Sequence, residues 1–281
     1  MHANTNSTKH YLEGASSFLP SPCPPARRCL TSAQVPVAFH VHHHRCVDHA
    51  QHHLAATWLT DCRSLLPESV QFYGIDIESK LFPAYASTPP NTHFSVGSAT
   101  SLPSYWTSKF SLVNQRLLIL ALTTSEWQKV ISEIYRVLEP GGYAQFIEID
   151  SKWYSGPKTA AHVAFLSTFL DAKGLDLHCC EHISRWMTAV GFVGVRSKEV
   201  TVKIGTWAGP IGEEARDASI GALRGMKGPV MKAGGMGYVT SPEEFDAKVD
   251  AVAEEWDRTV GSHRKLKVFY GMKPVQISTR M

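Results

Sequence analysis

The feature that most constrains the fold is an alternation of short apolar runs with helical patterns. Four runs are typical of buried strands: Val70–Ile77, His93–Gly97, Phe110–Asn114 and Tyr143–Ile149. A strong helical pattern separates the last two runs, and two closing strands are expected at Gly191–Arg196 and Lys267–Pro274. Strands that alternate with helices pair in parallel through right-handed crossovers. The sequence therefore predicts an α/β protein with a Rossmann-like, doubly wound and mostly parallel sheet.

Two helices have clear start signals. Ser125 and Gln128 have the spacing of a capping box, and the helix that follows carries one apolar stripe for packing on a sheet. The stripe consists of Trp127, Val130, Ile131, Ile134, Val137 and Leu138. Pro140-Gly141-Gly142 is expected to end this helix and to begin the next strand. A second helix is predicted at Ser241-Pro242-Glu243-Glu244, which combines an N-cap, a proline at the first helical position and a capping-box glutamate.

The first 56 residues differ in composition from the rest of the chain. Residues 16–56 hold five of the sixteen prolines, three of the six cysteines and seven of the fourteen histidines, but no glycine. We find no sustained helical or alternating period in them. We therefore expect residues 1–56 to form an atypical segment that is either disordered or translated in the wrong frame. The folded domain is expected to span residues 57–281 and to begin with a short helix at Trp58–Leu66.

Charge and apolar content exclude several classes of protein. The net charge is only +3 and charged residues make up 19% of the chain, so no nucleic-acid partner is expected. The apolar run Leu117–Leu122 has six residues, against the ~20 that a membrane span needs, so no membrane partner is expected either. The polar N-terminus and the lack of a CxxC pair favour a cytoplasmic protein with reduced thiols. The sequence leaves the oligomeric state open.

Histidine is abundant in the N-terminal segment, and imidazole is a good ligand for zinc, copper and nickel. His49, His52 and His53 share the spacing of one helical face. No carboxylate or cysteine completes a recognised site around them. We therefore expect adventitious binding at most, and no functional metal.

Polar and small residues follow three of the predicted strands at their carboxyl ends, where a doubly wound sheet binds its ligands. Asp76 lies at the end of the first strand, and its carboxylate can accept hydrogen bonds from both hydroxyls of a ribose. Ser98 and Ala99 follow the second strand, and Asn114 ends the third. Each residue alone has an ordinary structural explanation, such as capping a turn. Their succession along three strand ends favours a site for a ligand with a ribose and a purine.

The order of these motifs resembles that of class I S-adenosylmethionine-dependent methyltransferases. The motifs are Gly74-x-Asp76, then Gly97-Ser98-Ala99, then the hairpin Arg136-Val-Leu-Glu-Pro-Gly-Gly142 before the fifth strand. The longer pattern from Leu112 to Trp127 is similar to that of the fungal methyltransferases of secondary-metabolite clusters. This group includes enzymes of the gliotoxin type and the velvet-complex regulator. The resemblance covers about residues 57–274.

The resemblance implies S-adenosyl-L-methionine as the cofactor and a small-molecule secondary metabolite as the methyl acceptor. Enzymes of the gliotoxin type methylate amide nitrogens of epidithiodiketopiperazines. By the same resemblance, Asp76 would hold the cofactor ribose and Ile77 would pack on the adenine. Ser98 and Ala99 would border the adenine edge, and Asn114 would close the floor near the methionine moiety.

One departure from the family pattern concerns the loop after the first strand. The family has a glycine-rich loop there, followed by a tryptophan, because the backbone must approach the methionine part of the cofactor closely. Here Trp58 is preceded by His52-His53-Leu54-Ala55-Ala56, without glycine. Either the loop has been lost, leaving a pseudoenzyme or a regulator with the same fold, or residues 16–56 are not in the native reading frame. A fold relative that catalyses an isomerisation or cyclisation is a third interpretation.

No catalytic residue is assigned, because methyl transfer from a sulfonium depends mainly on positioning and desolvation. The acceptor can still need a base. The candidates are His162, His178 and His182, and for an amide nitrogen Glu148 and Asp150. Both carboxylates are better explained as structural. The candidate aromatic residues of an acceptor pocket are Trp153, Tyr154 and Trp207, and aromatic residues at such places more often belong to the core.

Overall fold

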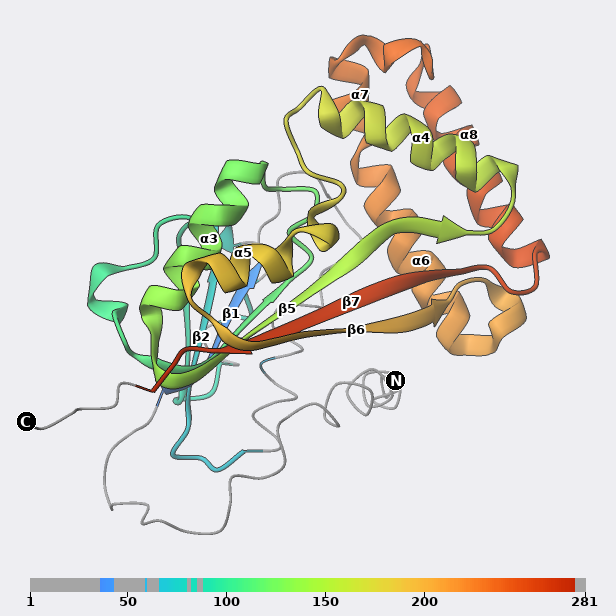
Figure 1. Cartoon of the computed structure of the whole chain (residues 1–281). Coiled ribbons are helices and arrows are strands. Elements are labelled where there is room, and N and C mark those ends of the chain that lie inside the picture. Colours follow the sequence, from blue (N-terminus) through green and yellow to red (C-terminus); the bar gives the residue numbers. More distant parts are fainter. Residues whose placement is uncertain (1–35, 43–58, 60–65, 80–81, 85–87, 276–281) are drawn as a thin grey trace, which may run out of the picture. The chain divides into compact units, whose positions relative to one another are not determined.

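The computed structural model describes residues 36–42, 59, 66–79, 82–84 and 88–275 (Figure 1). Within these residues, seven strands form one sheet in the order β3-β2-β1-β4-β5-β7-β6. The strands are β1 Pro36–His42, β2 Gln71–Asp76, β3 Thr92–Val96, β4 Phe110–Arg116, β5 Leu138–Tyr154, β6 Val193–Lys203 and β7 His263–Met272. The five strands from β3 to β5 pair in parallel, whereas β7 runs antiparallel to β5 and β6. The predicted α/β fold with a mostly parallel sheet is confirmed.

Strand β1 occupies the centre of the parallel part, between β2 and β4. His42, at its carboxyl end, pairs in register with Asp76 of β2, and His40 pairs with Asn114 of β4. The strand order reverses at β1, since β2 and β3 lie on one side and β4 and β5 on the other. In doubly wound sheets such a reversal opens a crevice outside the carboxyl ends of the strands, where ligands bind.

Strand β1 was not predicted from the sequence, and it places the start of the sheet upstream of the domain boundary predicted at residue 57. The alternation of Phe39 and Val41 with histidines is short and follows a proline-rich stretch, so its period did not stand out. The predicted disorder or wrong frame covers residues 1–56; residues 36–42 of this range form β1, and residues 1–35 and 43–56 lie outside the described residues. Of the predicted helix Trp58–Leu66, only Leu59 and Leu66 are described. Leu59 is helical and buried.

The described α-helices fall into two groups. They are α3 Thr124–Val137, α4 Pro157–Asp171, α5 Ile183–Val190, α6 Gly209–Gly225, α7 Lys227–Lys232 and α8 Pro242–Arg258. Helix α3 packs against α5 and β5. Helices α4, α6 and α7 each contact α8, and α4 also contacts β5 (Figure 1). None of the described helices is long and apolar enough to cross a membrane.

Helix α3 has a capping box, but two residues earlier than predicted. The Oγ1 of Thr123 accepts a hydrogen bond from the N–H of Glu126 at 3.3 Å, and the Glu126 carboxylate accepts one from the N–H of Thr123 at 2.9 Å. The predicted pair of Ser125 and Gln128 is therefore wrong. A carboxylate binds the N-cap N–H more strongly than an amide does, which favours the earlier start. The apolar stripe of the helix is buried as predicted.

Helix α8 begins where it was predicted. The Oγ of Ser241 accepts from the N–H of Glu244 at 3.2 Å, and Pro242 is the first helical residue. The Glu244 carboxylate accepts from the N–H of Thr240 at 2.7 Å, one residue before the N-cap. The local start signal was therefore sufficient for this helix.

Candidate cofactor and acceptor sites

Asp76 lies at the carboxyl end of β2, and only 2% of its surface is exposed. Its Oδ1 accepts a hydrogen bond from the N–H of Glu78 at 2.9 Å. Its Oδ2 is buried and has no hydrogen-bond partner among the described residues. Burial raises the pKa of Asp76 to about 6, and the N–H of Glu78 opposes this rise. A buried carboxylate oxygen needs donors, so Asp76 fits a ligand that brings hydroxyl groups.

The segment after β3 places the next predicted residues beside the end of β2. The N–H of Gly97 donates to the carbonyl of Asp76 at 2.8 Å, which joins the two strand ends. Ala99 is buried, whereas Ser98 and Ile77 are half-buried. Four of the five predicted cofactor residues therefore lie along the ends of two adjacent strands. Their contacts with a cofactor remain predictions.

The sequence predicts Asn114 at the end of a strand, but the structure places it inside β4. The strand continues to Arg116 and is followed by Leu117, whose φ of +55° is left-handed. Asn114 is fully buried, and its backbone lies in register with His40 of β1. It thus remains next to the carboxyl half of β1, and its role near the methionine moiety stays a prediction.

Glu148 of β5 holds the chain just beyond β4. It is fully buried, and its two carboxylate oxygens accept hydrogen bonds from the N–H of Leu118 at 2.8 Å and from that of Ile119 at 3.2 Å. Burial raises the pKa of Glu148 to about 8, while the two N–H groups oppose the rise. These contacts support the structural role that the sequence analysis preferred for Glu148.

A small pocket lies beside the second half of β5 and the segment that follows β4. Its volume is about 50 Å³, and it is lined by residues of the segment after β4 and of β5, α4, α6 and β7. Most of these residues are apolar; Asp150, Ser151 and Arg264 contribute polar groups. Asp150 accepts from the N–H of Lys152 at 3.0 Å and pairs with Lys267 at 3.0 Å. Burial by itself raises the pKa of Asp150, but these two partners outweigh it and lower the pKa.

Of the three candidate histidines, His178 lies beside this pocket. Its Nδ1 is 3.2 Å from the Oγ of Ser151, which lines the pocket. His162 is buried on α4, where its Nδ1 lies 3.0 Å from the hydroxyl of Tyr238, and burial lowers the pKa of His162 to about 4. His182 is the N-cap residue of α5, and its ring packs against a tryptophan of that helix. Of the three, the geometry therefore brings only His178 next to a residue that lines this pocket.

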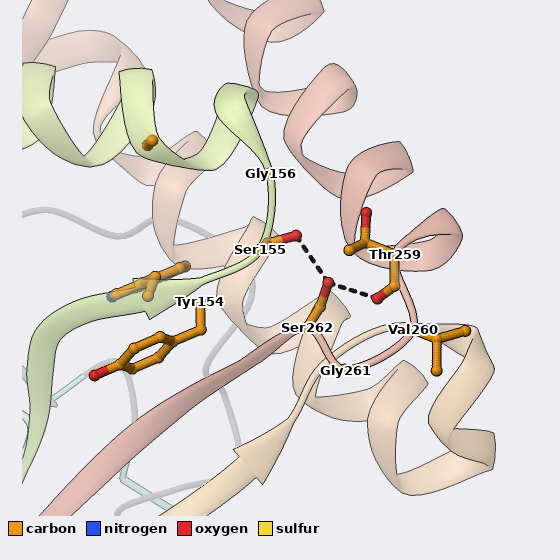
Figure 2. Close-up of a pocket in the computed structure, with 9 residues that line it drawn as sticks. Tyr154, Ser155, Gly156, Thr259, Val260, Gly261 and Ser262 are labelled. Carbon is orange, nitrogen blue, oxygen red and sulfur yellow. Dashed lines mark hydrogen bonds between the residues drawn. The ribbon is translucent and has the colours of Figure 1, made fainter.

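A larger, open hollow of about 380 Å³ lies where β5 meets α4 and where α8 meets β7 (Figure 2). Its lining includes Trp153–Gly156 and Thr259–Ser262, and the hydroxyls of Ser155 and Ser262 lie 2.8 Å apart across it. The Glu255 carboxylate already accepts hydrogen bonds from backbone N–H groups at the start of α4. This helix end is therefore satisfied by the protein itself.

The three candidate pocket aromatics lie in different places. Trp153 lines both cavities, and Tyr154 lines the open hollow. Trp207 donates its Nε1–H to the carbonyl of Ile204 at 2.8 Å, in the 3₁₀ turn before α6. The histidine-rich segment has no described side chains, so the metal prediction stays open.

Comparison with known proteins agrees with this geometry. Residues 36–142 match the methyltransferase domain family, a range that includes Asp76, Ser98 and Asn114. Over this range the chain is similar to the class I S-adenosylmethionine-dependent methyltransferases. The resemblance predicted from the sequence is thereby confirmed, and S-adenosylmethionine is the cofactor of this family.

Two fungal relatives match this methyltransferase over most of its length. It is 26% identical to N-methyltransferase sirN of Leptosphaeria maculans over 230 residues, and the aligned region covers 77% of each chain. It is 25% identical over 232 residues to N-methyltransferase gliN of Aspergillus fumigatus, which covers 77% of this chain and 79% of the relative.

Among solved structures, the fold resembles that of phosphoethanolamine N-methyltransferase 2 of Haemonchus contortus, solved in complex with S-adenosyl-L-methionine. The TM-score is 0.51 at 13% identity, and the match covers 95% of this chain. The chain spans about half the length of that enzyme, 52%.

Proposed function

We propose that this methyltransferase transfers the methyl group of S-adenosyl-L-methionine to a small-molecule secondary metabolite, at an amide nitrogen of an epidithiodiketopiperazine-type compound. The observation that carries the proposal is the Oδ2 of Asp76, which is buried and has no hydrogen-bond partner among the described residues. Asp76 ends β2, next to β1, where the strand order reverses. The choice of nitrogen is supported by sirN and gliN, which are named N-methyltransferases.

The cofactor residues fit a nucleoside at the crevice. Asp76 would accept hydrogen bonds from the ribose hydroxyls, and Ile77 would cover the adenine. Ser98 and Ala99 would border the adenine edge, and Asn114 would lie near the methionine moiety. The cofactor, when bound, supplies a methyl group that its sulfonium already activates. The protein's own contribution is alignment and the exclusion of water.

On the acceptor side, methylation of an N–H group releases one proton. We assign its removal to Ser151 and His178, because Ser151 lines the pocket and its Oγ lies 3.2 Å from the His178 ring. Asp150 is held by Lys267 and has a lowered pKa, so it suits a fixed negative charge better than a proton acceptor.

Entry of an acceptor requires the pocket to open. Its volume of about 50 Å³ is far below the ~300 Å³ or more of a typical small-molecule site. Helices α4 and α6 contribute part of the lining, and both belong to the group of helices that packs around α8. Movement of this helical group away from the end of β5 would enlarge the pocket.

Calorimetric titration of S-adenosylhomocysteine into the full chain tests the cofactor part of the proposal. The wild type should bind with a micromolar dissociation constant, and Asp76→Ala should bind more weakly. Glu254→Gln is the control, since the Glu254 side chain is 63% exposed on α8. No binding by the folded wild type would overturn the proposal.

A second assay tests the acceptor. The protein is incubated with S-adenosylmethionine and pairs of diketopiperazines that differ only in whether the ring nitrogen carries hydrogen or methyl. Mass spectrometry should detect one added methyl group on the N–H compounds alone. Methylation of a thiol or hydroxyl in both members of a pair would contradict the nitrogen acceptor.

A non-catalytic protein with the same fold is the second candidate. It is favoured by the sequence between Gly14 and Gly74, which contains no glycine although the family has its glycine-rich loop after the first strand. This reading predicts a folded wild type that neither binds S-adenosylhomocysteine nor transfers a methyl group. The calorimetric titration therefore separates the two candidates directly.

A further inference from the structure

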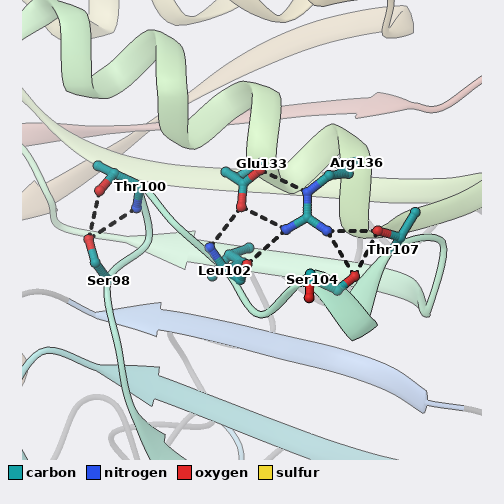
Figure 3. Close-up of polar contacts among 7 residues, drawn as sticks. All are labelled: Ser98, Thr100, Leu102, Ser104, Thr107, Glu133 and Arg136. Atoms are coloured by element: carbon teal, nitrogen blue, oxygen red, sulfur yellow. Dashed lines mark hydrogen bonds and ion pairs between the residues drawn. The ribbon is translucent and has the colours of Figure 1, made fainter.

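Two side chains of α3 hold the post-β3 segment, which we define as residues 97–107 (Figure 3). Glu133 and Arg136 are paired one turn apart, with Nε and Nη2 of the arginine 2.8 and 2.7 Å from the two carboxylate oxygens. The same carboxylate accepts a hydrogen bond from the N–H of Leu102 at 2.7 Å. Arg136 Nη2 also donates to the carbonyl of Leu102 at 3.0 Å. The ion pair therefore binds both backbone polar groups of Leu102.

Arg136 anchors the segment at a second place. Its Nη1 donates to the Oγ1 of Thr107 at 2.8 Å and to the carbonyl of Ser104 at 3.5 Å. The backbone carbonyl of Arg136 accepts a hydrogen bond from the N–H of Ser108 at 3.0 Å. Ser108 itself has a left-handed φ of +51°. One arginine thus fixes the path of the chain from Leu102 to the start of β4.

The first part of the segment is a turn closed by its own hydrogen bonds. The N–H of Ser101 donates to the carbonyl of Ser98 at 3.1 Å, and the N–H of Thr100 donates to the Ser98 Oγ at 3.2 Å. The Ser98 hydroxyl also lies 2.8 Å from the Thr100 hydroxyl (Figure 3). Because this turn runs directly into Leu102, a shift of Leu102 would carry Ser98 and Ala99 with it.

The ion pair is suited to positioning rather than to core packing. The side chains of Arg136 and Glu133 are 29% and 22% exposed. Arg136 lowers the pKa of Glu133, so the pair is charged at neutral pH. An ion pair that stays in partial contact with water contributes only modestly to global stability. Replacing one partner should therefore leave the protein folded but release the segment it holds.

We propose that Glu133 and Arg136 are positioning residues that set Ser98 and Ala99 against the adenine ring and thereby determine selectivity for that base. The inference rests on the proposed cofactor site and goes beyond it, since neither side chain belongs to the crevice. Selectivity depends on the pair because a base edge is distinguished only when its hydrogen-bond partners are held in one place.

The test compares two ligands and four proteins by calorimetry at neutral pH. The ligands are S-adenosylhomocysteine and S-inosylhomocysteine, which differ at the 6-position of the purine. The proteins are the wild type, Arg136→Met, Glu133→Gln and the control Arg258→Met. Arg258 is paired with Glu254 at 3.3 Å within α8, so this control also removes an exposed helical ion pair.

We expect Arg136→Met to weaken S-adenosylhomocysteine binding by about tenfold, the effect of losing one to two net hydrogen bonds. Its preference for the adenine ligand over the inosine ligand should fall toward unity. Glu133→Gln should show a smaller loss, because the amide oxygen can still accept from Leu102. Arg258→Met should behave as the wild type does.

The outcomes separate this inference from the proposed function. Failure of the wild type to bind S-adenosylhomocysteine would refute the proposed function, and the inference with it. A wild type that binds, with variants that keep both its affinity and its preference, would refute the inference alone. Equal weakening of both ligands in Arg136→Met would also refute it, because a general structural defect affects the two ligands alike.

Discussion

Replacement of Glu148 by glutamine should change how the stability of this methyltransferase depends on pH. Burial raises the pKa of Glu148 from 4.5 to about 8. The unfolded chain releases this proton near pH 4.5, whereas the folded protein keeps it until about pH 8. Between these values the folded state binds more protons than the unfolded chain, so the free energy of unfolding falls as the pH rises.

The magnitude follows from the width of that interval. It spans about 3.5 pH units, and each unit corresponds to about 1.4 kcal/mol for a single group. The contribution of Glu148 is fully present below pH 4.5, and up to about 5 kcal/mol of it is lost once the pH passes about 8. Glutamine does not titrate in this range, so Glu148→Gln should lack this loss.

Glutamine also changes the hydrogen bonds of the buried site. Its NH₂ group would face one of the two donors, the N–H of Leu118 or that of Ile119. An unpaired buried donor costs about 1–3 kcal/mol, so Glu148→Gln should be less stable than the wild type at pH 5. The difference should shrink with rising pH and reverse between about pH 5 and pH 7, where the wild type's own loss, at about 1.4 kcal/mol per pH unit above 4.5, reaches about 1–3 kcal/mol.

Urea unfolding of both proteins from pH 5 to pH 9, followed by tryptophan fluorescence, measures this difference. The exposed control Glu254→Gln should track the wild type over the whole range. Parallel curves for the wild type and Glu148→Gln would refute the reasoning, since they would mean that Glu148 binds its proton equally in the folded and unfolded chains.

Three further predictions concern other polar groups. Binding of S-adenosylhomocysteine should strengthen as the pH rises through about 6, because ionised Asp76 is the better acceptor for hydroxyls, and calorimetry should find this dependence absent in Asp76→Asn. Burial lowers the pKa of His162 to about 4 from 6.5, so the wild type should lose stability as the pH falls through this range, and His162→Phe should show a flatter profile in urea unfolding. Glu255→Ala should lower the free energy of unfolding by about 2 kcal/mol, because the start of α4 loses its cap; an unchanged denaturation midpoint would contradict that role.

The elements that the sequence predicted correctly are those whose signals are local. The buried stripe of α3 and the Ser241 start of α8 depend on residues three or four positions apart along the chain. The alternation of strands and helices likewise predicted a parallel sheet, because crossover geometry leaves few other arrangements. Asp76, Ile77, Ser98 and Ala99 were predicted as cofactor residues from their place after strands; the structure puts them along adjoining strand ends, and their contacts with a cofactor stay a prediction.

Other features required knowledge of what the chain packs against. Strand β1 is short and histidine-rich, and it was recognised only by its pairing with β2 and β4. Asn114 was placed at a strand end because the polar residues after it resemble a loop, yet they pair with β5.

By itself, the sequence determined the class of fold and the resemblance to methyltransferases, and it predicted the strand ends at which a nucleoside cofactor would bind. The tertiary structure alone decided which distant groups hold those strand ends. Leu102 is bound by Glu133, 31 residues away, and Leu118 by Glu148, 30 residues away. The physical reason is that an amphipathic period reflects burial of one face and can be read locally. A buried carboxylate has no such period, and its partner is whichever backbone N–H the assembled sheet brings within hydrogen-bond distance.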